Sequence, residues 1–146
     1  MSATEPRPNR AIVPVFATAA YLAGLIGLWG FTSLILDRDV IDYPDAGLFL
    51  GPFMAVCGCM LTFVGSWRVR RSPTPLLYGA LYAVIAFAAI VVLGAFGYSF
   101  ARANFAVIPA AALHFGISPF MIGAAVLCGI VVGFTGVLTR PRRARQ

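Results

Sequence analysis

Four long stretches of the sequence carry no charged residue, and short polar segments separate them. About 20 apolar residues are enough for a helix to cross the hydrocarbon core of a bilayer. Pro109 and Gly116 interrupt the last uncharged run, so we place the fourth span after them. The pattern predicts transmembrane helices over residues 11–36, 46–67, 75–100 and 118–139. The first span is expected to stay in the protein as an anchor, because its apolar run continues well past the small residues at 17–19.

The segments between these spans predict the connections. They are two loops on one side of the membrane, 37–45 and 101–117, one loop on the other side, 68–74, and a basic tail, 140–146. We expect a short interfacial segment within 104–117. Thr74 followed by Pro75 is typical of an N-cap and a first helical position. Loops this short leave no room for a second domain, so 1–146 is predicted to be a single membrane domain.

The composition favours a membrane protein over a soluble one. The chain has 146 residues, of which 60% are hydrophobic and 11% are charged, whereas a soluble domain has about 25% charged residues. A soluble fold of this length has too small a core to bury so much apolar surface. The expected fold class is therefore all-α integral membrane with four transmembrane helices. All 11 basic residues are arginine, a bias typical of GC-rich bacterial genomes, so we expect a bacterial plasma membrane.

The arginines in the loops predict the orientation of the helices. Basic residues concentrate in loops that face the cytoplasm. Only Arg38 and Arg102 fall on the outer side of the predicted bilayer. We therefore expect a multi-pass protein with both termini in the cytoplasm (N-in/C-in). The arginines on the inner side are Arg7, Arg10, Arg68, Arg70, Arg71, Arg140, Arg142, Arg143 and Arg145.

A weak internal likeness relates the two halves of the chain. When the sequence is compared with itself at a shift of 67 residues, seven of the 28 positions between Gly27 and Met54 are identical. The alternative explanation is chance likeness between apolar helices. A true tandem parallel repeat would consist of two helical hairpins of the same orientation, related by a pseudo-axis along the membrane normal. The matched pairs include Gly27 with Gly94, Gly30 with Gly97, and Pro52 with Pro119.

Small residues predict where the helices touch one another. Because glycine has no side chain, it lets two helix backbones approach closely in a membrane. Such contacts either close the bundle within one chain or join two copies in a homodimer. The expected packing positions are Gly27 and Gly30 in the first span, Gly94 and Gly97 in the third, and Gly129 and Gly133 in the fourth.

The predicted spans offer little chemistry. They contain no charged residue, histidine, asparagine or glutamine, and such residues mark proton relays, ion paths and substrate sites inside membranes. Cys57 and Cys59 point about 200° apart on a helix, so they do not converge on one metal ion together with Cys128. Buried thiols usually act as small hydrophobic groups. We predict no catalytic residue and no cofactor, and His114 is expected to be an interfacial residue rather than a pH sensor.

The loop at 37–45 is the strongest candidate for a functional surface. It holds four carboxylates within nine residues, and hard divalent cations prefer oxygen ligands. The glycine and the closing glutamate of an EF-hand are missing. The alternative, which we favour, is a solvated turn whose aspartates cap a helix or pair with Arg38 or Arg102. The candidate metal ligands are Asp37, Asp39, Asp42 and Asp45.

The same loop and its flanks resemble a known family. The resemblance lies in Leu36-Asp37-Arg38-Asp39-Val40-Ile41, in Asp45-Ala46-Gly47 and in Gly51-Pro52. These residues are similar to those of small four-helix membrane proteins of actinobacteria, which form a family defined by a domain of unknown function. The likeness covers the first two spans better than the rest. It implies a four-span fold, and it brings no activity, ligand or functional residue.

Three classes of function are compatible with this sequence. We expect a non-catalytic membrane protein, an accessory or structural subunit that packs in the lipid bilayer against a larger membrane partner or a second copy. The second class is a small oligomeric channel or transporter whose path runs between subunits. The third and least favoured is a membrane enzyme acting on lipid through the aspartate loop. The arginine tail is expected to fix the topology on the bilayer rather than to bind nucleic acid.

Overall fold

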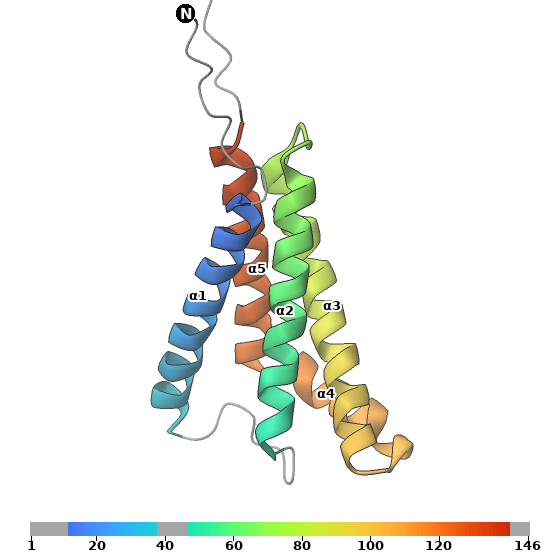
Figure 1. Cartoon of the computed structure of the whole chain (residues 1–146). Helices are drawn as coiled ribbons and strands as arrows, with labels where there is room; N and C mark the ends of the chain where they lie inside the picture. Colours follow the sequence, from blue (N-terminus) through green and yellow to red (C-terminus); the bar gives the residue numbers. More distant parts are fainter. Residues whose placement is uncertain (1–11, 38–46, 141–146) are drawn as a thin grey trace, which may run out of the picture.

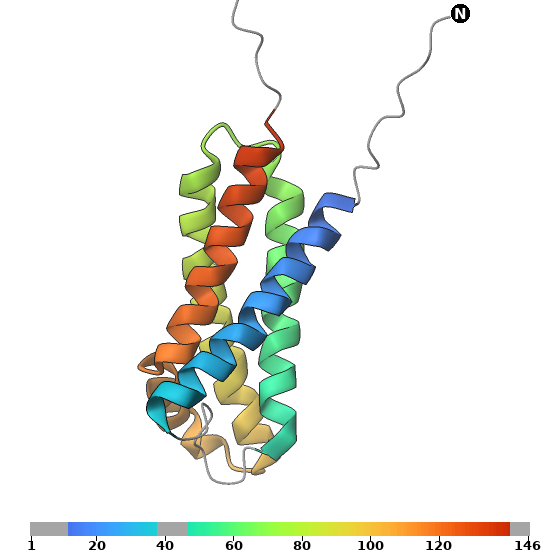
Figure 2. The ribbon, with the colours of Figure 1, turned by 90° about the vertical axis from the view of Figure 1, so that its left-hand side faces the viewer.

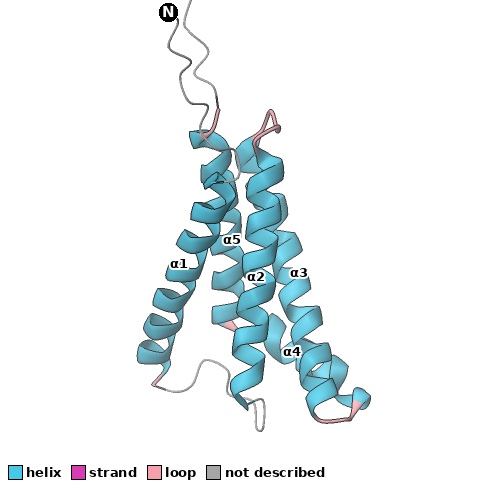
Figure 3. Ribbon diagram, viewed as in Figure 1, coloured by secondary structure: helices cyan, strands magenta, loops and turns pink. Residues whose placement is uncertain are grey.

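The computed structural model describes residues 12–37 and 47–140, and this part of the chain is helical without strands (Figure 3). Long apolar segments fold as helices because a helix satisfies its backbone polar groups internally, without water. The elements are α1 (Ile12–Leu36), α2 (Gly47–Val69), α3 (Pro75–Ala101), the 3-10 helix η1 (Phe105–Val107), α4 (Ile108–Gly116) and α5 (Pro119–Leu138).

Four of these helices, α1, α2, α3 and α5, are long and apolar enough to cross a membrane. The predicted all-α fold with four spans is confirmed. Each helix begins and ends within two residues of the predicted span, and the largest difference is at α2, which continues to Val69. The short interfacial segment expected within 104–117 is also helical, as η1 and α4.

The long helices form a ring in the order α1, α2, α3, α5 (Figure 1). Within the described chain α1 does not contact α3, whereas α2 and α5 meet across the ring. In the view of Figure 2, α1 runs obliquely across the face that α2 and α5 form. We call the end of the bundle where α1 begins and α5 ends the terminal end, and the opposite end, which holds α4, the loop end.

The closest helix contact joins α3 to α5. A Cβ atom added to Gly79 would lie 2.5 Å from the carbonyl oxygen of Gly129 and 2.9 Å from the Cα of Gly133. A Cβ atom on Gly129 would lie 2.7 Å from the Cβ of Ala83. The two backbones therefore touch directly, which only residues without a side chain allow.

The end of α3 is closed by hydrogen bonds typical of a Schellman motif. The backbone N–H of Asn104 donates to the carbonyl oxygen of Ser99 at 3.0 Å, and that of Ala103 donates to Phe100 at 3.0 Å. Ala103 has a φ of 49°, in the left-handed region that this motif requires. The Asn104 side chain then accepts from Ala106 N–H at 3.0 Å and starts η1.

The structure corrects the expected role of Thr74. Pro75 begins α3 as predicted, and Thr74 is at the N-cap position, but its side chain makes no capping hydrogen bond. Its backbone carbonyl oxygen accepts from the N–H of Tyr78 at 3.0 Å instead. With φ −126° and ψ 74°, Thr74 does not adopt the β-region backbone that is typical of a capping residue.

The internal repeat stays a prediction. In the ring, α1 lies opposite α3 and α2 lies opposite α5. Two hairpins of the same orientation, related by a pseudo-axis through the centre of the ring, would give this arrangement. The matched prolines differ in setting, because Pro119 begins α5 whereas Pro52 lies inside α2. The two halves also differ in packing, because α3 and α5 contact each other much more extensively than α1 and α2 do.

Replacing Gly79 with alanine is expected to lower stability, because the new methyl group would press on the Gly129 carbonyl oxygen. Overpacking of this kind costs about 1–3 kcal/mol. The matched control is Gly27→Ala, since nothing lies within 4 Å of a Cβ atom built there. Thermal unfolding in mild detergent, followed by circular dichroism, compares the two variants with the wild type. Equal Tm values for all three would contradict the backbone contact.

Replacing Ala103 with glycine is expected to stabilise the fold by about 1 kcal/mol, because the left-handed conformation is costly for alanine and not for glycine. The control is Ala101→Gly, which lies in the last turn of α3. Glycine inside a helix is destabilising by about 0.5–1 kcal/mol relative to alanine. Tm shifts of opposite sign are therefore expected in the same unfolding assay.

Candidate functional site

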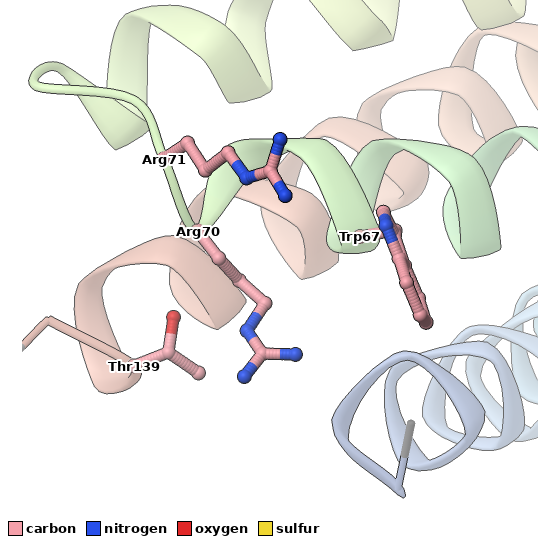
Figure 4. A pocket seen from close by; sticks show the side chains of 4 residues that line it. All are labelled: Trp67, Arg70, Arg71 and Thr139. Carbon is pink, nitrogen blue, oxygen red and sulfur yellow. The ribbon is translucent and has the colours of Figure 1, made fainter. Parts of the chain in front are cut away.

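The terminal end of the bundle holds a pocket between the ends of α2 and α5, lined by Trp67, Arg70, Arg71 and Thr139 (Figure 4). Its volume is about 290 Å³. The backbone N–H of Arg71 donates to the carbonyl oxygen of Arg68 at 3.2 Å, so the chain turns as α2 ends. This turn places both arginines beside the last residues of α5. We call these four residues the basic pocket.

The side chains of the basic pocket combine cationic and aromatic groups. Arg70 is half-buried and Arg71 is exposed. The Thr139 hydroxyl donates to the carbonyl oxygen of Thr135 at 2.7 Å, which leaves its oxygen as an acceptor. Trp67 is 48% exposed and stacks on Phe63, with 6.3 Å between ring centroids. The pocket therefore offers planar guanidinium donors next to an apolar surface.

The charges of the described chain are distributed unevenly between its two ends. Arg68, Arg70, Arg71 and Arg140 all lie at the terminal end. Asp37, directly after α1 at the loop end, is the single carboxylate within residues 12–37 and 47–140. The terminal end of this part of the chain is consequently electropositive.

A second polar cluster lies inside the bundle, where α1, α2 and α5 meet. The Thr62 hydroxyl lies 2.9 Å from the carbonyl oxygen of Gly58 and 3.3 Å from the Sγ of Cys128, and it can donate to either. Tyr21 is fully buried, and its hydroxyl has no hydrogen-bond partner among the described residues. A Cβ atom on Gly58 would collide with that hydroxyl, so Gly58 makes room for the tyrosine ring.

This cluster consists of hydroxyl and thiol groups, which favours interior packing over chemistry. Among residues 12–37 and 47–140, no three His, Cys, Asp or Glu side chains are placed to hold a metal ion. The small pocket next to Tyr21 and Met54 has a volume of about 10 Å³. A space of that size holds at most about one water molecule.

The glycines predicted as packing positions fall into two groups. Gly129 and Gly133 lie against α3, a Cβ atom on Gly94 would collide with the Met54 side chain, and one on Gly97 would lie 3.4 Å from Phe53. Gly27 and Gly30 differ from the expectation: they are exposed, and no atom lies within 4 Å of a Cβ atom built on either. The oblique course of α1 turns this side of the helix away from the bundle. Gly58 and Gly79, two tight packing positions, were missed because neither has a second glycine three or four residues away along the helix.

The predicted aspartate site lies mostly outside the described residues. Asp37 is exposed and has a φ of 48°, a left-handed conformation that aspartate tolerates at a helix end. Asp39, Asp42 and Asp45 are not among the described residues, so cation binding by this loop stays a prediction. The tail residues Arg142, Arg143 and Arg145 also lie outside the described residues, so their role in fixing the topology stays a prediction. Arg102 lies at the loop end, with its guanidinium carbon 5.6 Å from the centre of the Tyr98 ring.

The comparison with known families covers almost the whole chain, since a family model matches residues 3–146. The chain belongs to DUF6121, a family of unknown function. The expectation of a family defined by a domain of unknown function is confirmed, and its actinobacterial origin stays a prediction. No curated protein and no solved structure matches this DUF6121 chain.

Replacing Tyr21 with phenylalanine is expected to raise stability, because a buried hydroxyl without a partner costs about 1–3 kcal/mol. Thr62→Val is the control, since the Thr62 hydroxyl has partners in Gly58 and Cys128 and its loss should lower stability. Thermal unfolding in detergent measures both. A lower Tm for Tyr21→Phe would mean that the hydroxyl has a bonding partner.

Proposed function

We propose that this DUF6121 chain is a non-catalytic accessory subunit of a bacterial plasma membrane, with both termini in the cytoplasm. In this proposal it docks against a transmembrane helix of a larger membrane protein. The observation that carries it is the exposed small-residue face of α1. This face is defined by Ala20, Ala23, Gly27 and Gly30.

The spacing of these four residues places them along one side of α1, because residues three and four apart lie above one another on a helix. All four are exposed, and nothing in the described chain packs within 4 Å of a Cβ atom on Gly27 or Gly30. In lipid, apolar surface alone does not drive helices together, and association depends on close packing at small residues. A partner helix could approach the α1 backbone closely at these four residues.

An apolar groove adjoins this face between α1 and α5. It has a volume of about 380 Å³. Gly27 belongs to both the groove and the small-residue face, so a helix lying on α1 would also reach α5. The groove is lined by Gly24, Gly27, Leu28, Phe31, Gly123, Val126, Leu127 and Ile130.

The interior of the bundle supports an accessory role more than transport through a single chain. Among the described residues, the small pocket beside Tyr21 has a volume of about 10 Å³, far too small for a continuous aqueous path. A small oligomeric channel, with its path between copies, is the alternative. It would use the same exposed face of α1 for contacts between identical chains.

The test replaces Gly27 and Gly30 together with leucine and recovers the tagged protein from native membranes in mild detergent. Misplaced bulk in a close contact costs about 1–3 kcal/mol, so the yield of a stoichiometric larger partner should fall roughly tenfold or more. The Tm of the isolated chain should not fall, because both positions are open and leucine favours a helix more than glycine does. Ala88→Leu, on the exposed side of α3, is the control and should retain the partner.

Two results would overturn this proposal. One is full recovery of the partner by the Gly27→Leu/Gly30→Leu variant, which would remove α1 from the interface. The other is recovery of only a homo-oligomer from the wild type. Ion or solute flux in liposomes containing that homo-oligomer would then establish the channel alternative.

A further inference from the structure

We propose that the basic pocket binds the phosphate-bearing headgroup of an anionic phospholipid. The pocket lies where the apolar parts of α2 and α5 end, after Trp67 and Leu138. α5 has 20 residues and is therefore about 30 Å long, close to the thickness of the hydrocarbon core. A helix of this length reaches from one edge of that core to the other, so the residues directly beyond its end are expected at the level of the lipid headgroups.

The donors in the pocket match a phosphate group. Arginine presents N–H groups in a planar fork that binds two phosphate oxygens at once. Arg70 and Arg71 both line the same pocket, and Figure 4 shows the guanidinium of Arg70 extending into the space between Thr139 and Trp67. The indole N–H of Trp67 is a further donor, because tryptophan carries one N–H and no acceptor.

The apolar surface next to the donors distinguishes a lipid from free phosphate. Phe63 lies one turn before Trp67 on α2, and both side chains are exposed and stacked at 6.3 Å. This pair continues from the pocket along an exposed side of α2. An acyl chain would cover both rings, whereas inorganic phosphate would leave them uncovered.

The charge of this end favours an anionic headgroup over a zwitterionic one. Two further arginines, Arg68 and Arg140, lie at the terminal end without lining the pocket. Basic pockets between transmembrane helices are known to hold anionic headgroups. The site is separate from the groove between α1 and α5, since no residue lines both. If the basic pocket did not bind lipid, the proposed contact between α1 and a partner would therefore be unaffected.

The experiment titrates the full chain in neutral detergent with phosphatidylglycerol and counts bound lipids by native mass spectrometry. The pocket variant is Arg70→Gln/Arg71→Gln, and the matched control is Arg68→Gln/Arg140→Gln, which removes the same charge from the same end. The general electrostatic attraction between the chain and the headgroup should fall equally in these two variants. Loss of forked hydrogen bonds should weaken the pocket variant by at least about tenfold more than the control.

Further arms of the same titration define the ligand. Arg70→Lys/Arg71→Lys keeps the charge and loses the fork, so its affinity should fall between those of the wild type and the glutamine variant. Phosphatidylcholine should bind at least about tenfold more weakly than phosphatidylglycerol. Equal losses in the pocket and control variants, equal binding of phosphatidylcholine, or displacement of the lipid by equimolar inorganic phosphate would each overturn the proposal.

A second readout uses the position of Trp67 and does not depend on affinity in detergent. In a Trp29→Phe background, Trp67 is the only tryptophan in the chain. Phosphatidylglycerol with brominated acyl chains should quench its fluorescence in the wild-type pocket more strongly than brominated phosphatidylcholine. The Arg70→Gln/Arg71→Gln variant, shown to be folded by circular dichroism, should lose that difference. Equal quenching by both lipids in the wild type would contradict the site.

Discussion

Where α3 passes α5, the two backbones lie so close that a single methyl group on Gly79 would press on the carbonyl oxygen of Gly129. In a bilayer this direct contact replaces the hydrophobic effect as the means of joining helices, because lipid is as apolar as the side chains. The α3–α5 pair forms the most extensive helix contact in the described chain, and α2 contacts both of its members. α1 reaches α2 and α5 but not α3. The positions of the other helices thus depend on this pair.

The oblique course of α1 has a direct consequence for function. Since α1 crosses α2 and α5 at an angle (Figure 2), its small residues do not all fall against the bundle. Gly24 packs against Leu127, whereas Gly27 and Gly30 have no neighbour within 4 Å of a Cβ atom. Helix α1 therefore carries one face that packs against the bundle and another that is exposed in the described chain.

Polar groups are distributed so that the membrane-length helices need no water. Most serine and threonine hydroxyls in them donate to a carbonyl oxygen one turn earlier, as Thr18 does to Pro14 at 2.9 Å and Ser99 does to Ala95 at 2.7 Å. The Tyr21 hydroxyl is a buried exception. Cationic groups gather instead at the terminal end, where the basic pocket combines arginine with tryptophan. The contacts between helices thus lie in the middle of the bundle, and the residues proposed to bind a lipid headgroup lie at its terminal end.

The sequence by itself determined the four long helices, because charge-free length and proline positions suffice to locate spans in a bilayer. It predicted a short interfacial segment after α3, and only the structure shows that this segment is helical. It did not determine which faces of the helices turn inward. A helix that is apolar all round has no polar side to mark its exposed surface. Gly27 and Gly79 are therefore alike in sequence, yet one is open and the other is in backbone contact. The basic pocket likewise joins Arg70 of one hairpin to Thr139 of the other, and only the packing of α2 beside α5 brings such distant residues together.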